Sequence, residues 1–324
     1  MKIIITGALG HIGSRLIREI PRHFPGSDII MIDNLSTLRY CSLFNLSDYC
    51  NFKFIEADIT HIDLKEYIVN ADVVVHLAAI TDAAHSFHIR EKVALGNFSG
   101  TKTIARLCRK NNVPMIHISS TSVYGSQSSI MDENCSEEQL KPQSPYAATK
   151  LKEENLLSEY KERGLKYTIC RFGTVCGISS GARFNTTVNK LCWQGVMGQP
   201  LTVWRTAQFQ KRPYLTLQDA VDAIIHIIKK ELYDCKIYNI LTENMTVNDL
   251  LDIICKFLDN VEISYVDSEM MNQLSYEVSN KRFKDTGFRF RGSLESSIQT
   301  VIKTLYNSGT HDIQENAPEQ TLLY

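Results

Sequence analysis

The fold of this chain is decided by its opening stretch, Lys2-Ile3-Ile4-Ile5-Thr6-Gly7-Ala8-Leu9-Gly10-His11-Ile12-Gly13. It begins as an apolar, β-branched run typical of a buried strand, and a helical pattern follows at Ile12–Ile20. The glycines Gly7, Gly10 and Gly13 meet three needs of a pyrophosphate site: a sharp turn, close backbone approach and tight helix-on-strand packing. The helix N-terminus then faces the anion. The stretch therefore predicts a dinucleotide-binding turn.

An acidic residue, Asp33, stands twenty residues beyond Gly13, at the end of a second predicted strand. A carboxylate there accepts hydrogen bonds from the adenosine ribose and repels a 2′-phosphate, so NAD is favoured over NADP. A tight turn without a ligand also uses glycine, but here the strand, the helix and the acid all fall where the fingerprint requires. We expect four more residues to contact the cofactor: His11, Ile12, Asp33 and Asn34. We interpret His11 as a solvent-facing loop residue.

Strand and helix patterns alternate through the first half of the chain. The predicted strands are Lys2–Thr6, Asp28–Ile32, Phe52–Glu56, Val73–His76, Met115–Ser119 and Tyr167–Arg171. The predicted helices between them are Ile12–Ile20, Ser99–Asn111 and Tyr146–Arg163. This alternation predicts βαβ units and a parallel sheet. The fold class is α/β: a Rossmann-type doubly wound parallel sheet with a smaller C-terminal α/β substrate-binding lobe.

The regular alternation lapses after about residue 173. Further helices are predicted at Phe184–Gly195, Gln218–Lys230, Thr246–Leu258 and Leu294–Tyr306, and strands at Leu201–Trp204 and Ile237–Leu241. We expect an NAD-binding domain at 1–173, to which 213–241 returns. The substrate lobe is expected to comprise 174–212 and 242–306, and 307–324 is expected to be a flexible tail.

Composition excludes several classes of protein. The chain has 324 residues, of which 44% are hydrophobic and 22% charged. Its formal net charge is −1, and its acidic and basic residues are interspersed. This favours a globular protein and disfavours a nucleic-acid or membrane partner. The first apolar run is too short for a signal peptide or a membrane span, so a cytoplasmic location is expected. The nine cysteines form no CxxC pair, and we expect reduced thiols and no metal.

A second motif is Tyr146-Ala147-Ala148-Thr149-Lys150, which begins a predicted helix after Pro145. Its four-residue spacing puts Tyr146 and Lys150 on one face. An ammonium beside a phenol stabilises the phenolate, the form that a general base for an alcohol needs. A Tyr and a Lys also meet by chance on solvated helix faces. Here a hydroxyl cluster, Ser119–Ser122, ends a strand where ligands of doubly wound sheets bind, which favours the catalytic interpretation.

At these residues the sequence resembles the extended short-chain dehydrogenase/reductases, specifically the NAD-dependent sugar-nucleotide epimerase/dehydratase family. The resemblance covers about residues 1 to 305. It implies that Ser120, Tyr146 and Lys150 are catalytic, with Tyr146 and Lys150 also contacting NAD. The further cofactor contacts that it implies are Asp58, Ile59, Leu77, Ala78, Ala79, Asn97 and Ser119.

The resemblance implies a mechanism in which Tyr146 takes a proton from a sugar hydroxyl, at C4, while a hydride passes to NAD. Ser120 would bind the same oxygen, and Lys150 the nicotinamide ribose. The expected substrate-binding residues are Thr81, Ser120, Thr121, Thr174, Arg183, Asn189 and Arg212. For Arg183 and Asn189 the alternative is an ordinary helix start with a solvated arginine.

The implied substrate is a nucleotide-diphosphate sugar, and the implied activity is that of an epimerase or oxidoreductase. A net 4-dehydrogenase or reductase uses the same residues and remains open, as does a non-catalytic NAD-binding regulator. A 4,6-dehydratase is disfavoured because Thr121-Ser122 stands where dehydratases of the family carry Asp-Glu. The resemblance also implies a homodimer through Ser99–Asn111 and Tyr146–Arg163, although amphipathic helices also pack within one subunit.

Overall fold

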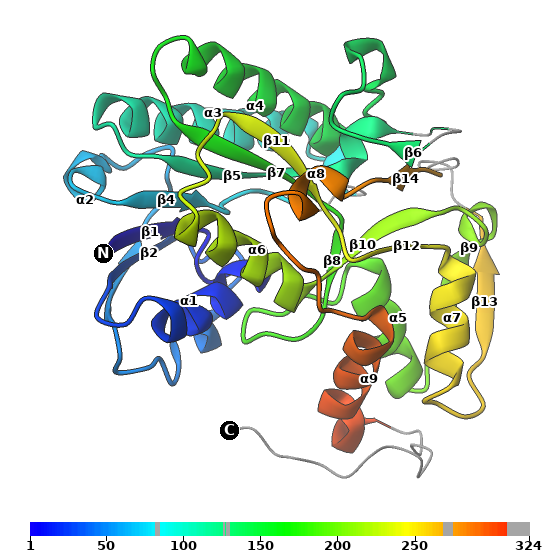
Figure 1. The fold of residues 1–324 in the computed structure, drawn as a ribbon. Helices are drawn as coiled ribbons and strands as arrows, with labels where there is room; N and C mark the ends of the chain where they lie inside the picture. The colour runs from blue at the N-terminus through cyan, green and yellow to red at the C-terminus, as the bar shows by residue number, and fades with distance from the viewer. Residues whose placement is uncertain (82–84, 126, 128–129, 268–274, 310–324) are drawn as a thin grey trace.

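The computed structural model describes residues 1–81, 85–125, 127, 130–267 and 275–309 (Figure 1). Most of the predicted tail, 310–324, lies outside the described residues. The described part folds around one large parallel sheet, with a smaller group of helices and strands beside it (Figure 1).

The central sheet has seven strands in the order β11-β7-β5-β4-β1-β2-β3, and every neighbouring pair is parallel. The strands are β1 (Lys2–Thr6), β2 (Asp28–Asp33), β3 (Asn51–Glu56), β4 (Val73–His76), β5 (Met115–Ser120), β7 (Tyr167–Phe172) and β11 (Lys236–Ile240). Ile3, Ile4 and Ile5 are all fully buried because β1 is covered on both faces. The predicted Rossmann-type fold is confirmed.

Helices cover both faces of this sheet (Figure 1). One face carries α3 (Arg90–Lys110) and α4 (Pro145–Lys161), with the short α2 (Lys65–Ile68) near the edge, and the other carries α1 (His11–His23) and α6 (Leu217–Lys229). The prediction for α3 was wrong at its start, which lies nine residues before Ser99. Gly100 weakens the helical signal there, yet it is needed, since a Cβ at Gly100 would meet Ile59 Cδ1 at 2.6 Å.

The second lobe has its own apolar core. Its helices are α5 (Thr187–Val196), α7 (Val247–Cys255) and α9 (Leu294–Leu305). Its strands are β8 (Thr174–Cys176), β10 (Arg212–Thr216) and β12 (Glu243–Met245) in one small sheet, and β9 (Leu201–Trp204) with β13 (Ile263–Val266) in another. A third pair, β6 (Ile130–Met131) and β14 (Glu277–Val278), adjoins α8 (Lys281–Lys284). We propose the lobe boundaries given above, with β11 in the first lobe.

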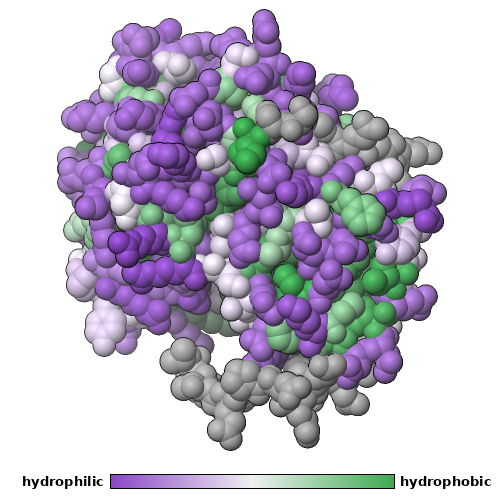
Figure 2. Space-filling view, turned by 45° about the vertical axis from the view of Figure 1, so that its right-hand side comes forward, coloured by the Kyte–Doolittle hydropathy of each residue, from purple (hydrophilic) through white to green (hydrophobic). Residues whose placement is uncertain are grey.

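The surface of the second lobe carries exposed apolar side chains, namely Trp193, Phe209, Tyr265 and Val266. Figure 2 turns this side of the molecule forward and shows apolar patches separated by hydrophilic ones. Within the described ranges, no helix combines the length and the apolar character that crossing a membrane requires.

Candidate active site

The candidate site lies where the order of the central sheet reverses. From β1 the chain proceeds to β2 and β3 on one side and then returns to β4 on the other. Ligands of doubly wound sheets bind at such a switch point, outside the carboxyl ends of the strands. The glycine turn follows β1 there, and Leu77–Ala79 follow β4. The fold thus places these two predicted cofactor segments side by side.

The glycine turn fits a pyrophosphate group. Gly7 has φ +68°, and a Cβ on it would lie 2.6 Å from Ala78 N. A Cβ on Gly13 would lie 2.4 Å from Gly7 O, so helix α1 packs directly on the turn. Gly10 precedes the first residue of α1, whose first N–H groups have no partner inside the helix. The first turn of α1, all of it described, carries no acidic side chain, which favours an anion there.

The interpretation of His11 as a solvent-facing loop residue was wrong. His11 is the first residue of α1 and is only 5% exposed. Its Nδ1 lies 3.1 Å from Ser179 Oγ, which in turn donates to the His11 carbonyl. Burial, followed by the nearby Arg183 and Arg39, lowers the pKa of His11 to about 3. His11 is therefore a neutral contact between the glycine turn and a segment of the second lobe, and Ile12 follows it in the helix.

Asp33 ends β2 and holds the turn through its carboxylate. Oδ2 accepts from Leu9 N at 3.1 Å, and Oδ1 accepts from Leu35 N at 3.0 Å. Asn34 donates to Asp58 Oδ2 at 3.2 Å, so these residues form a second group at the carboxyl ends of β2 and β3. A carboxylate has about four acceptor positions. Asp33 therefore keeps the capacity to bind a ribose hydroxyl.

Several predicted cofactor residues have structural contacts. Ile59 is buried and packs against Gly100 of α3. Asn97, also buried, accepts from Ile80 N at 2.8 Å and donates to Ile80 O at 3.0 Å. Its amide thereby fixes the backbone that follows Leu77, Ala78 and Ala79. The contact of these residues with a cofactor stays a prediction.

Helix α4 presents the predicted catalytic pair. Ser144 caps it by accepting from Ala147 N at 3.1 Å, and Pro145 occupies the first turn, where its missing N–H costs nothing. Lys150 Nζ lies 6.0 Å from the centre of the Tyr146 ring. Lys150 is 3% exposed, and Tyr146 is half-buried. The helix thus fixes a buried ammonium one turn from a phenol that remains partly accessible.

Sequence reasoning missed the groups beneath Lys150. Its Nζ donates to Glu153 Oε2 at 2.9 Å, and the same oxygen lies 3.1 Å from His117 Nε2 of β5. Burial works against ionisation of Glu153, but Lys150 and then His117 outweigh it and lower its pKa to about 2. Burial likewise opposes the charge on Lys150, yet Glu153 first and Tyr146 second raise the pKa of Lys150. The three-residue spacing from Lys150 is the sequence signal that could have found Glu153.

The predicted hydroxyl residues lie at the end of β5. Ser119 donates to buried Glu154, which pairs with Arg171 of β7 through Nη2 at 2.6 Å. Ser120 Oγ lies 2.8 Å from Ser122 Oγ and accepts from its backbone N–H. Because α4 packs against β5 and the turn that follows it, Ser120 and the Tyr146–Lys150 pair share one region.

The remaining predicted substrate residues fall into two groups. Thr121 is buried, and its hydroxyl lies 3.5 Å from the Tyr276 hydroxyl. Burial raises the pKa of Tyr276, and Thr121 and then Arg212 act against this rise. Thr174 starts β8 and pairs with Tyr214 of β10, the strand that Arg212 begins.

The second group lies at the start of α5. Arg183 Nη1 donates to Thr81 Oγ1, so this hydrogen bond joins the second lobe to the segment that follows β4. Asn189 is fully buried, and its amide donates to the carbonyls of Gly177 and Arg183 and accepts from Gly177 N. The structural alternative is therefore favoured for Asn189, because both amide hydrogens are already used.

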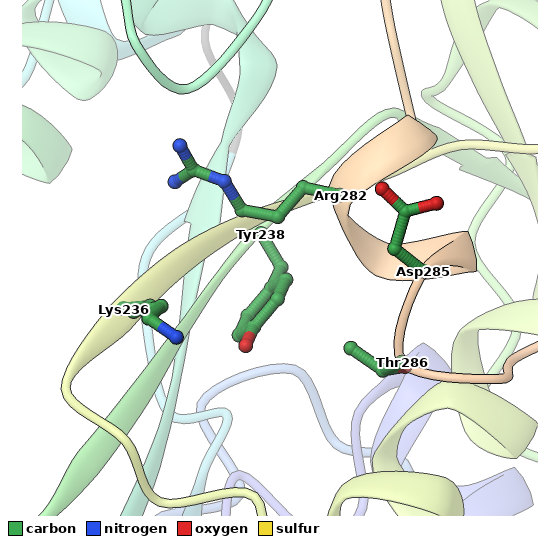
Figure 3. Close-up of a pocket in the computed structure, with 5 residues that line it drawn as sticks. All are labelled: Lys236, Tyr238, Arg282, Asp285 and Thr286. Carbon is green, nitrogen blue, oxygen red and sulfur yellow. The ribbon is translucent and has the colours of Figure 1, made fainter.

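An open hollow lies away from these residues (Figure 3). It is formed by β11 and the end of α8, and its lining residues are Lys236, Tyr238, Arg282, Asp285 and Thr286. Arg282 donates to Ile237 O, and Asp285 pairs with Lys281 at 2.8 Å. These two charged side chains already have partners within the protein. We therefore do not assign a ligand to this hollow.

The chain is similar to known proteins in sequence. A family model described as the NAD dependent epimerase/dehydratase family matches residues 3–240. A trifunctional UDP-glucose 4,6-dehydratase/UDP-4-keto-6-deoxy-D-glucose 3,5-epimerase/UDP-4-keto-L-rhamnose-reductase of Arabidopsis thaliana is 29% identical over 93% of this chain and 46% of that protein. An uncharacterized UDP-glucose epimerase of Bacillus subtilis (strain 168) is 32% identical over 71% of this chain and 73% of that protein. The chain spans about half the length of the trifunctional relatives.

The chain is also similar to solved structures. The UDP-glucuronic acid 4-epimerase from Bacillus cereus, in complex with UDP-glucuronic acid and NAD, superimposes with a TM-score of 0.82 at 26% identity. The similarity covers 94% of this chain and 100% of that one. Both lobes described above therefore have counterparts in one known fold.

Proposed function

Because this chain belongs to the NAD dependent epimerase/dehydratase family, we propose that it is an epimerase of a nucleotide-activated sugar. It is an enzyme of that family, and the family's dependence on NAD confirms the predicted cofactor. One similar protein of known structure is a UDP-glucuronic acid 4-epimerase bound to UDP-glucuronic acid and NAD. The activity of that protein supports a nucleoside diphosphate sugar as substrate and C4 as the reacting carbon.

The observation that carries the proposal is the shared position of Tyr146, Lys150 and Ser120. Lys150 is buried one helical turn from Tyr146, and Ser120 ends β5, against which α4 packs. A binding protein without chemistry has no need of this set. The arrangement suits proton abstraction from an alcohol.

The residues that would hold NAD are those of the glycine turn and Asp33. The first backbone N–H groups of α1 would bind the pyrophosphate, and the carboxylate of Asp33 would accept hydrogen bonds from the ribose. Bound NAD supplies reversible acceptance of a hydride from a sugar carbon.

The protein's own side chains carry out the proton transfer. Tyr146 Oη takes the proton of the sugar hydroxyl, while Ser120 Oγ donates a hydrogen bond to the same oxygen. Lys150 supplies the positive charge that stabilises the phenolate. The keto sugar would then present its opposite face, and Tyr146 would return the proton to the oxygen as the hydride returns to the carbon, which gives the epimer.

Epimerisation is proposed over dehydration because of Thr121 and Ser122. Elimination of water needs an acid and a base beside the sugar, and neither hydroxyl side chain ionises in the working range. The Arabidopsis relative includes a 4,6-dehydratase in its name, so product analysis must decide. An epimerase returns an isomer with no net NADH, a dehydrogenase accumulates NADH, and a dehydratase yields a 4-keto-6-deoxy sugar.

The test replaces Tyr146 by Phe and follows turnover of a panel of uridine and thymidine diphosphate sugars. We expect a loss of at least about 1000-fold in kcat, since the general base is removed. Tyr160→Phe is the matched control, because Tyr160 lies on the same helix and is buried among Arg109 and Arg163. Turnover by Tyr146→Phe equal to that of Tyr160→Phe would contradict the assignment.

A further inference from the structure

We propose that Glu153 is a positioning residue for Lys150, whose carboxylate fixes the ammonium in place and keeps it charged over the working pH range. This inference rests on the proposed function, because Lys150 is assigned there to the phenolate and the cofactor. It adds to that assignment a residue that touches neither substrate nor cofactor.

The geometry places Glu153 under Lys150 rather than at the protein surface. Glu153 is fully buried, and Lys150 is 3% exposed. Both lie on α4, three residues apart, and Glu153 Oε2 accepts from Lys150 Nζ at 2.9 Å. The ammonium therefore points along the inner face of the helix and cannot swing into solvent without losing its counter-ion.

The surroundings of Lys150 contain few other charges that could replace this carboxylate. On α4 itself, Tyr146 and Glu154 also face it, and Glu154 is committed to Arg171 of β7. From β5 and β4, respectively, come His117 and His76. Their rings stack with centroids 5.8 Å apart. Burial lowers the pKa of both histidines, so they are neutral in the working range.

His117 lies against Glu153 on the side of the sheet, and His76 stacks on His117. His117 Nε2 lies 3.1 Å from the same Oε2 that accepts from Lys150. His76 is held by Thr6 Oγ1 at 2.7 Å and Thr101 Oγ1 at 3.1 Å. The carboxylate is thus bound between the sheet and the ammonium, which limits its movement and that of Lys150.

Stability alone does not account for Glu153. Among the described residues, none donates a hydrogen bond to its second oxygen, Oε1. A buried ion pair seldom improves on well-packed apolar residues, and a half-satisfied carboxylate is worse still. An effect on Lys150 gives a physical reason for the residue. Without the carboxylate, the largest of the interactions that offset the burial of the charge on Lys150 would be lost.

The expected consequence of the Glu153 carboxylate is that activity persists to higher pH. Lys150 must stay protonated to support Tyr146, and burial alone would lower the pKa of Lys150 below the ordinary 10.5. In Glu153→Gln the amide keeps the shape but not the charge. We therefore expect the alkaline limb of kcat/KM to move to lower pH by about one unit or more, because an opposite charge at this distance shifts a pKa by about 1–3 units.

The experiment measures Lys150 directly as well as turnover. The Nζ resonance of Lys150, assigned by its absence from Lys150→Met, is followed by ¹⁵N NMR against pH in the full chain. In the wild type we expect it to stay protonated at about pH 10. In Glu153→Gln we expect it to titrate at lower pH, in parallel with the alkaline limb of kcat/KM. Glu153→Asp, which keeps the charge, should restore most of the alkaline range.

Glu19→Gln is the control for loss of a buried acid. Glu19 is 5% exposed on α1 and pairs with Arg15 and Arg22, so its loss should leave both readouts unchanged. The inference is overturned if Glu153→Gln retains the wild-type alkaline limb and Lys150 titration. If Glu153→Gln does not fold, deprotonation of Lys150 below about pH 9 in the wild type overturns it instead. The NMR readout is independent of substrate, whereas failure of the proposed function would appear as full activity in Tyr146→Phe.

Discussion

Replacing Gly13 by Ala should separate cofactor binding from folding. A Cβ at position 13 would lie 2.4 Å from Gly7 O and 2.6 Å from Ala8 O, both of them backbone atoms that cannot rotate away. Ordinary contacts begin at 3.4 Å, so helix α1 and the turn must move apart by about 1 Å. Such overpacking costs about 1–3 kcal/mol of folding free energy.

The effect on NAD binding should be at least as large as the effect on folding free energy. A displacement of about 1 Å lengthens an N–H···O bond beyond hydrogen-bonding range. Hydrogen bonds to a charged group contribute about 1.5–3 kcal/mol each, so losing one or two weakens NAD binding by about 3 kcal/mol, which is more than about 100-fold in Kd.

The assay is calorimetric titration of NAD into the purified protein, with thermal unfolding measured in parallel. Gly96→Ala is the matched control, because a Cβ there would meet its nearest atom, Ile80 Cδ1, at 3.8 Å. This control should bind NAD like the wild type and be no less stable, since Ala is favoured over Gly inside a helix. Binding of NAD by Gly13→Ala within threefold of the Gly96→Ala value would refute the reasoning.

Two further predictions concern the buried charges beneath α4. Arg171→Met leaves Glu154 as an uncompensated buried carboxylate, so we expect urea denaturation to show a loss of about 3–5 kcal/mol in the free energy of unfolding. The double variant with Glu154→Leu should recover much of this loss, and a loss below about 1 kcal/mol in the single variant would contradict the prediction. Glu153 has its pKa lowered from 4.5 to about 2 in the folded protein, so its contribution to stability is present above pH 4.5 and is lost as the pH falls toward 2. The advantage of the wild type over Glu153→Gln should shrink by about 2 kcal/mol between pH 6 and pH 3, and a constant difference would show that Glu153 is not charged in the native state.

The features that the sequence predicted well depend on neighbours within one element or one turn. The glycine turn is specified by β1, three glycines and the start of α1, all within a dozen residues. The placement of Tyr146 and Lys150 on one face follows from their spacing of a single helical turn. The strands Lys2–Thr6 and Val73–His76 were predicted to the residue because their apolar runs are bounded sharply.

The features that were missed depend on distant segments. Ser179, which covers His11, lies 168 residues further along the chain, so no local pattern could show that His11 is buried. Lys152-Glu153-Glu154 is typical of a solvated helix face, yet Glu153 and Glu154 are buried. Their burial follows from His117 on β5 and Arg171 on β7, which only the assembled sheet brings beneath α4.

The position of β11 has a consequence for biosynthesis. Its backbone pairs with β7, whose six residues are all buried, but 63 residues separate the end of β7 at Phe172 from the start of β11 at Lys236. A nascent chain that has emerged only as far as β7 exposes an unpaired, apolar strand edge, a surface prone to aggregation. The ribosome must therefore deliver the first part of the second lobe, residues 174–212, before the sheet of the first lobe can be completed. An expression fragment that ends at residue 173 would be a poor substitute for the whole protein.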